Sequence, residues 1–379
     1  MTMQLGVGIS GYGFIGRVHA FAHRNLPMMY DPLPAATRLV GVCTATEASG
    51  ARAIRQAGFQ FATTDFNALL EHPDIDVIHI CTPNAQHYPQ ILGALRAGKH
   101  IYCDKPLALN VPQAKEIVEL AKKSHGKHGM TFNYRYVPAT MKAKELIDSG
   151  FLGEVLQFRG AYLHAGYVDP SRPISWRMRK EISGGGAIMD LGVHIFDLMR
   201  HLLGEFTSLN AMLTTKIEER PDGKGGTAKV DVDDLALVHA RLASGAVGTL
   251  EASRLSTGKQ DELRFEIHGV RGAISFNLMD PNWLEIYDAN LPSGPLGGSR
   301  GPQKLECVAR YPHPYSFGAT GSSVGWPQFH IQCLYDFIEN VASGRTSSPS
   351  FEDGLAAQRF VEACQISSST GTSVNIESL

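Results

Sequence analysis

The stretch that most constrains this chain is QLGVGISGYGFIG at residues 4–16, where an apolar run leads into glycines spaced G-x-G-x-x-G. A strand, a tight glycine turn and a helix start in this order are typical of a βαβ unit that binds a dinucleotide. Gly11 permits the turn, Gly13 lets the backbone approach a pyrophosphate, and Gly16 lets the helix pack closely on the strand. The helix N-terminus then offers N–H groups to the phosphates. The residues predicted to hold the pyrophosphate are Gly11, Gly13, Phe14, Ile15 and Gly16.

Strands and helices alternate through the first third of the chain. The expected strands are 4–10, 38–44, 76–82, 99–106 and 129–136, and the expected helices follow Gly16 and span 48–58, 87–98 and 111–126. This alternation predicts right-handed βαβ units around a mostly parallel sheet. We therefore expect an N-terminal Rossmann dinucleotide-binding domain over residues 1–135.

Beyond residue 137 the pattern changes to period-2 alternation. After a helix at 138–150, strands are expected at 207–218, 234–243, 246–255, 262–269, 272–278 and 283–288, and two helices at 328–343 and 353–370. Many hairpin-linked strands favour a large antiparallel sheet. The predicted fold class is α/β, with a C-terminal α/β domain over 136–379 that carries a large, mainly antiparallel open sheet.

Composition excludes several classes of protein. Lys plus Arg is 35 and Asp plus Glu is 37, so no basic nucleic-acid surface or polybasic membrane patch is expected. No run of about 18 apolar residues suggests a membrane span, and the N-terminus lacks the pattern of a signal peptide. The 6 cysteines are scattered without a CxxC pair. We expect a reduced, cytoplasmic protein.

The choice of dinucleotide depends on the end of the second strand, where an acidic residue would bind a free ribose. Thr44 occupies this position, and no basic residue that would bind a 2′-phosphate follows until Arg52. Glu47 is either a ribose ligand or a solvated charge at a helix start. NAD is slightly preferred, and NADP remains open.

Two later segments follow strands at the edge where open α/β sheets bind their ligands. CTPNAQH (81–87) is expected to line the nicotinamide side of the cofactor, with His87 equally suited to an ordinary helix start. CDKP (103–106) places Asp104 and Lys105 over the same cleft, because Pro106 restricts the preceding lysine to an extended backbone. The candidates from the first segment are Thr82, Pro83, Asn84 and His87.

The stretch SGGGAIMDLGVHIFD (183–197) places Asp190 and His194 at i and i+4 on one helical face. Three interpretations are open: a metal site, a buried structural hydrogen bond, or an acid/base pair. No recognisable motif supplies the third protein ligand that a catalytic zinc needs. The apolar residues around the pair argue against a solvated face. No metal is expected.

Taken together and in order, GYGFIG, CTPNAQH, CDKP, NYRY, SWR and GGGAIMDLGVHIFD resemble the Gfo/Idh/MocA oxidoreductases. The resemblance implies that Lys105, Asp190 and His194 form the catalytic group, and that the C-terminal sheet joins copies into a homo-oligomer, a dimer or tetramer. Asp104 stands where the family more often has Glu. Further cofactor contacts implied by the resemblance are Asn133, Trp176 and Arg177.

The family acts on secondary alcohols of sugars, glycosides or cyclitols with NAD(P). In such chemistry His194 suits the general acid/base, Lys105 the charge that stabilises a developing alkoxide, and Asp190 the group that orients the imidazole or binds a hydroxyl. Tyr162 and His164 are candidate substrate contacts. The alternatives are a glycoside-processing enzyme with recycled NAD and a transient 3-keto step, and a non-catalytic NAD(P)-binding regulator.

Overall fold

The computed structural model describes residues 3–308, 311–317 and 321–379. The chain divides into two compact units, which we call unit 1 and unit 2. Unit 1 consists of Met1–Tyr136, Tyr311–Ala319 and Gly325–Gln358, and unit 2 of Val137–Arg310, Thr320–Val324 and Arg359–Leu379. The first change of unit falls after Tyr136, one residue beyond the end of the expected first domain. Residues 325–358, however, belong to unit 1 and not to the C-terminal domain in which the sequence had placed them.

Unit 1 contains a parallel sheet of six described strands in the order β3-β2-β1-β4-β5-β6. This order is that of dinucleotide-binding sheets, which take their ligand at the carboxyl edge of the strands. The strands are β1 (Met3–Ser10), β2 (Ala35–Cys43), β3 (Phe61–Thr63), β4 (Val77–Ile80), β5 (His100–Cys103) and β6 (His128–Met130). The helices are α1 (Phe14–Met29), α2 (Glu47–Ala57), α3 (Asn67–Leu70), α4 (His87–Arg96), α5 (Val111–Ala121) and α9 (Trp326–Ser343).

The strand expected at 129–136 is wrong beyond Met130. NYRY forms a 3₁₀ turn, Asn133–Tyr136, instead. Its side chains are held by distant residues: the Arg135 guanidinium pairs with Asp353 at 3.1 Å, and the Tyr136 hydroxyl donates to Asp336 at 2.8 Å. Such tertiary contacts override the β propensity of aromatic residues.

Helix α9 packs against α1 within unit 1. The Tyr30 ring, just after α1, stacks on Tyr335 with centroids 4.0 Å apart, and its hydroxyl donates to Gln332 at 2.6 Å. Residues of α9 such as Leu334 and Phe337 share one buried cluster with β1 and α1. A helix 300 residues away in sequence thus completes the core of the first unit.

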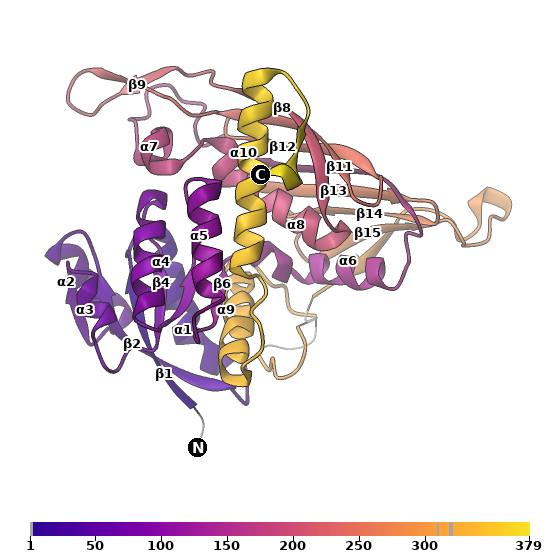
Figure 1. Cartoon of the computed structure of the whole chain (residues 1–379). Helices are drawn as coiled ribbons and strands as arrows, with labels where there is room; N and C mark the ends of the chain where they lie inside the picture. The colour runs from indigo at the N-terminus through magenta and orange to yellow at the C-terminus, as the bar shows by residue number, and fades with distance from the viewer. Residues whose placement is uncertain (1–2, 309–310, 318–320) are drawn as a thin grey trace. The chain divides into compact units, whose positions relative to one another are not determined.

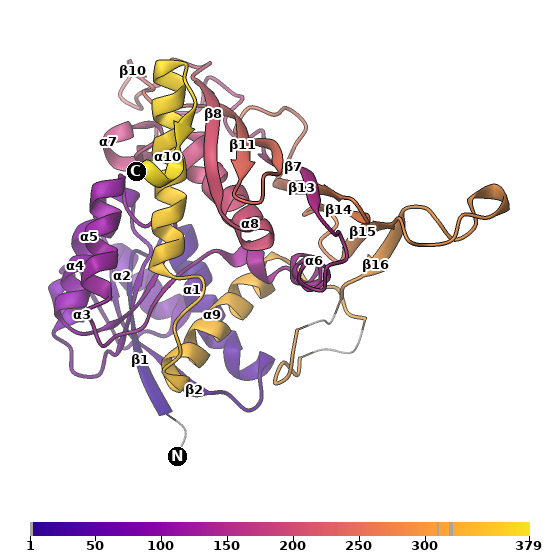
Figure 2. The ribbon, with the colours of Figure 1, turned by 45° about the vertical axis from the view of Figure 1, so that its right-hand side comes forward.

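Unit 2 contains a sheet of nine described strands in the order β16-β15-β14-β13-β7-β12-β11-β8-β17, antiparallel except for the pair β7 and β12. Its strands are β7 (Val155–Leu163), β8 (Phe206–Thr214), β11 (Leu235–Leu242), β12 (Val247–Ser253), β13 (Glu262–Gly269), β14 (Gly272–Asn277), β15 (Trp283–Asp288), β16 (Gln303–Glu306) and β17 (Val374–Asn375). A short hairpin is formed by β9 (Glu219–Pro221) and β10 (Thr227–Lys229). The segment between β15 and β16 projects from the sheet (Figure 2).

One face of this sheet is covered by α6 (Pro138–Asp148), the π-helix η4 (Ile188–Gly192) and α8 (Val193–Leu203) (Figure 1). Helix α10 (Phe351–Thr370) begins in unit 1 and ends in unit 2. Strand β11 alternates buried and exposed side chains, as a half-covered sheet requires. The predicted α/β class and the large, mainly antiparallel open sheet are therefore confirmed.

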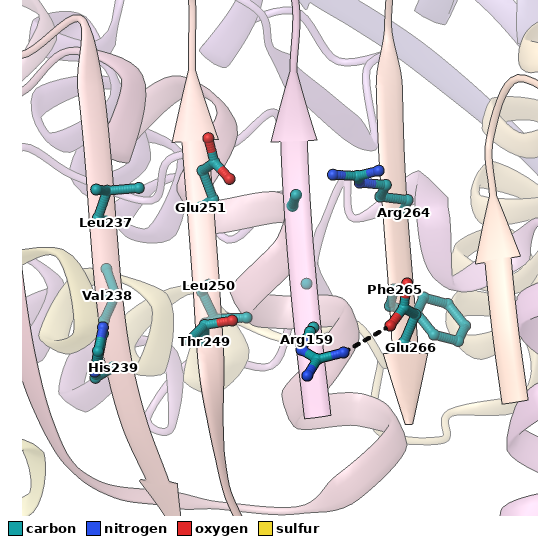
Figure 3. Close-up of a pocket in the computed structure, with 12 residues that line it drawn as sticks. Arg159, Leu237, Val238, His239, Thr249, Leu250, Glu251, Arg264, Phe265 and Glu266 are labelled. Carbon is teal, nitrogen blue, oxygen red and sulfur yellow. Dashed lines mark hydrogen bonds and ion pairs between the residues drawn. The ribbon is translucent and has the colours of Figure 1, made fainter. Parts of the chain in front are cut away.

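The other face carries a shallow concavity among the described residues. Arg159 pairs with Glu266 there at 3.2 Å, beside Thr249 and Glu251 of β12 and Leu237 of β11 (Figure 3). These side chains point away from η4 and α8, because residues of opposite parity on the same strands face the helices. The concavity is therefore separate from the Asp190 and His194 motif.

Candidate active site

The glycines of GYGFIG differ in whether the surrounding atoms leave room for a side chain. Gly11 has φ +91°, and a Cβ on it would lie 2.5 Å from the Cys81 carbonyl oxygen. A Cβ on Gly16 would lie 2.0 Å from the Gly11 carbonyl oxygen. A Cβ on Gly13 would meet no atom within 4 Å. Gly11 and Gly16 are thus needed to fold the turn, whereas the open space at Gly13 is available to a ligand.

Helix α1 begins in a way that favours an anion. No side chain caps its N-terminus at Gly13, and its first turn contains no acidic residue. The first N–H groups of a helix and the positive end of its dipole then remain for an external acceptor. The turn, including Phe14 and Ile15, is thus suited to an anion, and its contact with a pyrophosphate stays a prediction.

We expect Gly13→Ala to weaken dinucleotide binding without destabilising the fold. The added methyl group meets no protein atom, but it occupies the space that the phosphates would approach. The Kd for NADH should rise about tenfold or more, equivalent to about 1.4 kcal/mol, while the melting temperature stays within a degree or two of wild type. Gly11→Ala is the contrasting variant and should lower the melting temperature. Unchanged NADH affinity in Gly13→Ala would contradict this assignment.

The strand ends of unit 1 place the predicted cofactor residues at the same edge of the sheet. Thr44 follows β2 and is buried, with its hydroxyl donating to the Thr46 carbonyl at 2.9 Å. Thr82, Pro83 and Asn84 follow β4, while Asp104 and Lys105 follow β5 and are half-buried. Because β2 and β4 flank β1, the loops after them adjoin the GYGFIG turn, and the loop after β5 lies beside the loop after β4.

His87 has surroundings that differ from the predicted cofactor contact. Its ring is 1% exposed, with Nδ1 2.7 Å from the Pro106 carbonyl oxygen and Nε2 3.0 Å from that of Thr82. Burial lowers the pKa of His87, and a neutral ring donates to one of these two carbonyls. The side chain therefore braces the loop after β4 against the loop that carries Lys105.

Asn133 has a buried side-chain amide that shows whether this turn suits a polar ligand. Its side chain is 2% exposed, and its Nδ2 has no hydrogen-bond acceptor among the residues that the structure describes. A buried amide without a partner costs about 1–3 kcal/mol. A bound polar group that accepts this N–H would remove the cost, so Asn133 fits the cofactor role implied by its motif.

In unit 2, Asp190 and His194 lie on consecutive helical segments. Asp190 is in the π-helix η4 and His194 in the first turn of α8, and both are half-buried. The sequence had predicted a regular α-helix here, whereas π turns are rare and frequent at functional sites. The Tyr162 ring lies edge-on to His194 with centroids 5.9 Å apart, and the Tyr162 hydroxyl donates to Asp261 at 2.6 Å. The predicted substrate contact Tyr162 and the predicted acid/base His194 are therefore neighbours.

The remaining predicted residues of unit 2 lie on short segments near β7. His164 directly follows β7 and is half-buried; burial lowers its pKa, against the opposing effect of the Asp190 carboxylate. Trp176 and Arg177 form a 3₁₀ turn, with the guanidinium 4.4 Å from the indole centroid. Lys105 belongs to unit 1, whereas Asp190 and His194 belong to unit 2.

The glycines of SGGG have a structural explanation that the sequence did not indicate. The Asp233 carboxylate accepts hydrogen bonds from the N–H groups of Gly186 and Ile188, each at 2.8 Å. A Cβ on Gly186 would lie 1.7 Å from the Asp233 carbonyl oxygen. Only glycine allows this approach, which anchors the first turn of η4.

Sequence reasoning also missed Arg254. It is 1% exposed, and its Nη2 donates to the Asp190 carboxylate at 3.0 Å. Neither Asp233 nor Arg254 lies in a motif. Asp233 precedes β11 and Arg254 follows β12, and both strands show ordinary alternation. An isolated arginine after a strand carries no sequence signal that distinguishes it from a surface residue.

Among the described residues, no group of three or more His, Cys, Asp or Glu side chains is arranged to hold a metal ion. None of the described helices is both long and apolar enough to cross a bilayer.

Comparison with known proteins identifies the family. Residues 5–132 match the oxidoreductase family with an NAD-binding Rossmann fold, and residues 140–275 match the GFO/IDH/MocA C-terminal domain. A levoglucosan dehydrogenase of Pseudarthrobacter phenanthrenivorans is 37% identical over 368 residues, 93% of each chain. A myo-inositol 2-dehydrogenase of Thermotoga maritima is 28% identical over 98% of each chain.

Solved structures agree with this relationship. A levoglucosan dehydrogenase in complex with NADH and L-sorbose superposes with a TM-score of 0.94 at 36% identity, over 99% of both chains. The same enzyme in complex with NADH and levoglucosan also gives a TM-score of 0.94. The resemblance carried by the sequence motifs is confirmed: the chain belongs to the Gfo/Idh/MocA family of NAD-binding oxidoreductases.

Proposed function

We propose that this protein is an NAD-dependent dehydrogenase that oxidises a secondary hydroxyl of an unphosphorylated sugar or anhydrosugar of the levoglucosan type. The observation that carries the proposal is the 37% identity to levoglucosan dehydrogenase over 93% of each chain. The Asp190 and His194 motif, with Tyr162 beside it, supplies groups that bind hydroxyls and move a proton.

Bound NAD supplies the hydride acceptor in this chemistry. His194 takes the proton of the substrate hydroxyl, because an imidazole is the side chain best suited to proton transfer near neutral pH. Lys105 provides a positive charge that stabilises the alkoxide as the proton leaves. Asp190 accepts a hydrogen bond from a neighbouring hydroxyl or from the imidazole, and so fixes the orientation of the reacting groups.

The residues around the proposed site favour a neutral, polyhydroxylated substrate. His164 is half-buried, and Tyr162 is buried with its ring edge-on to that of His194. Tyr162 is in turn hydrogen-bonded to Asp261, so its ring has a fixed orientation. The Asp261 carboxylate would disfavour a phosphorylated sugar, whereas the charge of Asp190 is compensated by Arg254.

The proposal is tested by following the absorbance of reduced cofactor with levoglucosan, free pyranoses, glycosides and inositols, each with NAD and NADP in parallel. We expect turnover with levoglucosan or a related sugar, and a higher kcat/KM with NAD than with NADP. Thr44, in place of an acidic residue, makes the preference for NAD modest. Accumulation of NADH separates a dehydrogenase from an enzyme that recycles bound NAD. Absence of reduced cofactor with every sugar would overturn the proposal.

We also propose that the open face of the nine-stranded sheet joins copies of the chain into a dimer or tetramer. The concavity around Arg159 and Glu266 in Figure 3 lies on this face. Light scattering of wild type, and of a variant with Leu237→Glu on the exposed face, would test the assembly: a monomeric wild type would contradict it.

The described cysteines are all free thiols, which suits a reducing cytoplasm.

A further inference from the structure

We propose that Arg254 is a positioning residue for the reaction, which holds the Asp190 carboxylate in its working orientation from the interior of unit 2. The inference rests on the proposed function, in which Asp190 contacts the substrate or the imidazole. It concerns a residue outside every motif that identified the site.

Arg254 and Asp190 form a pair with very unequal exposure. The Arg254 side chain is 1% exposed, whereas that of Asp190 is 25% exposed. Nη2 of Arg254 donates to Oδ2 of Asp190 at 3.0 Å, and Nη1 donates to the Arg177 carbonyl oxygen at 3.3 Å. The guanidinium therefore holds the carboxylate from the protein side, while the carboxylate reaches the surface on which a substrate would bind.

The charge of Arg254 is maintained despite its burial. Burial acts to lower the pKa of the guanidinium, but the carboxylates of Asp190 and Asp233 and the Tyr167 side chain outweigh it, so that the pKa lies above its ordinary value. The Tyr167 ring also lies 4.7 Å from the guanidinium carbon, at cation–π distance. A buried cation is costly unless it is paired, so the position of Arg254 is tied to that of Asp190.

The backbone of the same turn is fixed independently. Asp233 holds the N–H groups of Gly186 and Ile188 at the start of η4. Asp233 precedes β11 and Arg254 follows β12, and the Arg254 N–H donates to the Asp234 carbonyl at 2.9 Å. Residues at two adjacent strand ends thus fix the segment 186–190. Asp233 holds its backbone, and Arg254 holds the side chain of Asp190.

Arg220 offers a matched control. It is also 1% exposed and its guanidinium carbon lies 5.9 Å from the centroid of the same Tyr167 ring. Its Nη1 and Nη2 donate to the carbonyl oxygens of Asp169 and Tyr167, at 2.7 and 2.5 Å. Arg220→Met therefore removes a guanidinium that is as deeply buried as that of Arg254, but it leaves the contact between Arg254 and Asp190 in place.

The test compares Arg254→Met, Arg254→Lys, Arg220→Met, Asp190→Asn and the double variant Arg254→Met/Asp190→Asn. For each, kcat, KM and NADH affinity are measured in the full-length protein with NAD and the best sugar of the screen, starting with levoglucosan. Arg254→Met should lower kcat/KM about 100-fold, the cost of a reacting group misplaced by about 1 Å. Arg254→Lys keeps the charge but lacks the planar guanidinium that bonds both the Asp190 carboxylate and the Arg177 carbonyl. Its kcat/KM should fall about tenfold. Arg220→Met should keep wild-type kcat/KM per folded molecule, and NADH affinity should be unchanged in all five.

Non-additivity separates positioning from general stabilisation. If Arg254 acts through Asp190, adding Arg254→Met to Asp190→Asn should lower kcat/KM no further than about twofold. Multiplicative losses, or a wild-type kcat/KM in Arg254→Met, would overturn the inference. If Arg254→Met does not fold, Arg254→Lys provides the test: an undiminished kcat/KM in that variant would also overturn the inference. Loss of activity in Asp190→Asn without loss in the Arg254 variants rejects this inference alone, whereas wild-type activity in Asp190→Asn rejects the proposed role of Asp190 itself.

Discussion

Replacing His194 by asparagine or Lys105 by methionine is expected to lower kcat by about 10²–10⁴-fold, the usual contribution of a general acid/base or of a fixed charge at a developing alkoxide. His194→Asn keeps a polar side chain of similar shape but cannot exchange a proton near neutral pH. Lys105→Met keeps the length of the side chain and removes its charge. Because neither change touches the glycine turn at residues 11–16, NADH affinity should change far less than kcat.

Two variants control for nonspecific effects. His201→Asn changes a histidine two turns further along α8, and Lys115→Met changes an exposed lysine on α5. Both should retain wild-type kcat. Steady-state kinetics with NAD and the best sugar, together with NADH titration, measure the effects. A kcat within threefold of wild type in both His194→Asn and Lys105→Met would remove these residues from the chemistry.

Acid should destabilise unit 1 strongly, because three neutral histidines form a hydrogen-bonded chain in its core. His23 Nδ1 lies 3.0 Å from the Thr37 hydroxyl, and His23 Nε2 lies 3.0 Å from His79 Nε2. His79 Nδ1 lies 2.9 Å from His19 Nδ1, and His19 Nε2 lies 3.5 Å from the Thr131 hydroxyl. Each neutral ring can donate at one nitrogen and accept at the other. A proton added to any ring would place a positive charge in the buried core, where desolvation disfavours it.

The direction of the pH effect follows from the pKa values. Burial lowers the pKa of His19 and of His23 from 6.5 to about 3, and that of His79 well below 6.5. The neighbouring His330, Tyr102 and Cys81 are also held in their neutral forms by burial. The unfolded chain takes up protons below pH 6.5 while the folded chain does not, so the free energy of unfolding falls as the pH drops from about 6.5 toward about 3. Between pH 7 and pH 5 each histidine should lower the free energy of unfolding by about 2 kcal/mol, and the three together by about 6 kcal/mol.

Urea unfolding between pH 7 and pH 4.5 measures this loss. The slope of the free energy of unfolding against pH gives the number of protons taken up on unfolding. His79→Leu should reduce that number by about one. Stability that is constant from pH 7 to pH 5 would show that the three rings do not stay neutral in the folded protein.

Much of the fold was predictable because its signals are local. The apolar strand before Gly11, the glycine spacing and the strand–helix alternation are consequences of neighbouring residues, and they predicted the parallel sheet of unit 1. Period-2 alternation likewise located the strands 262–269 and 283–288 at their observed bounds. Asp190 and His194 were also indicated by their spacing on one face of a helix.

The parts that could not be predicted depend on contacts between distant segments. NYRY becomes a turn because Asp353 and Asp336 bind its side chains, and α9 joins unit 1 through Tyr30 and Gln332. The approach of Asp233 to Gly186 requires that β11 lie beside η4, which no local pattern encodes. Arg254 was missed for the same reason, since its importance lies only in the carboxylate that it contacts.

Transfer of the substrate's hydrogen to the cofactor is the event that defines the proposed enzyme. Wild-type protein is incubated with NAD and levoglucosan deuterated at its ring carbons, and the reduced cofactor is analysed by mass spectrometry. We expect NADH that carries one deuterium, with none in the matched reaction of His194→Asn over the same time. Reduced cofactor without deuterium, or no reduced cofactor from levoglucosan and the other deuterated sugars of the screen, would contradict hydride transfer from a sugar carbinol carbon to NAD.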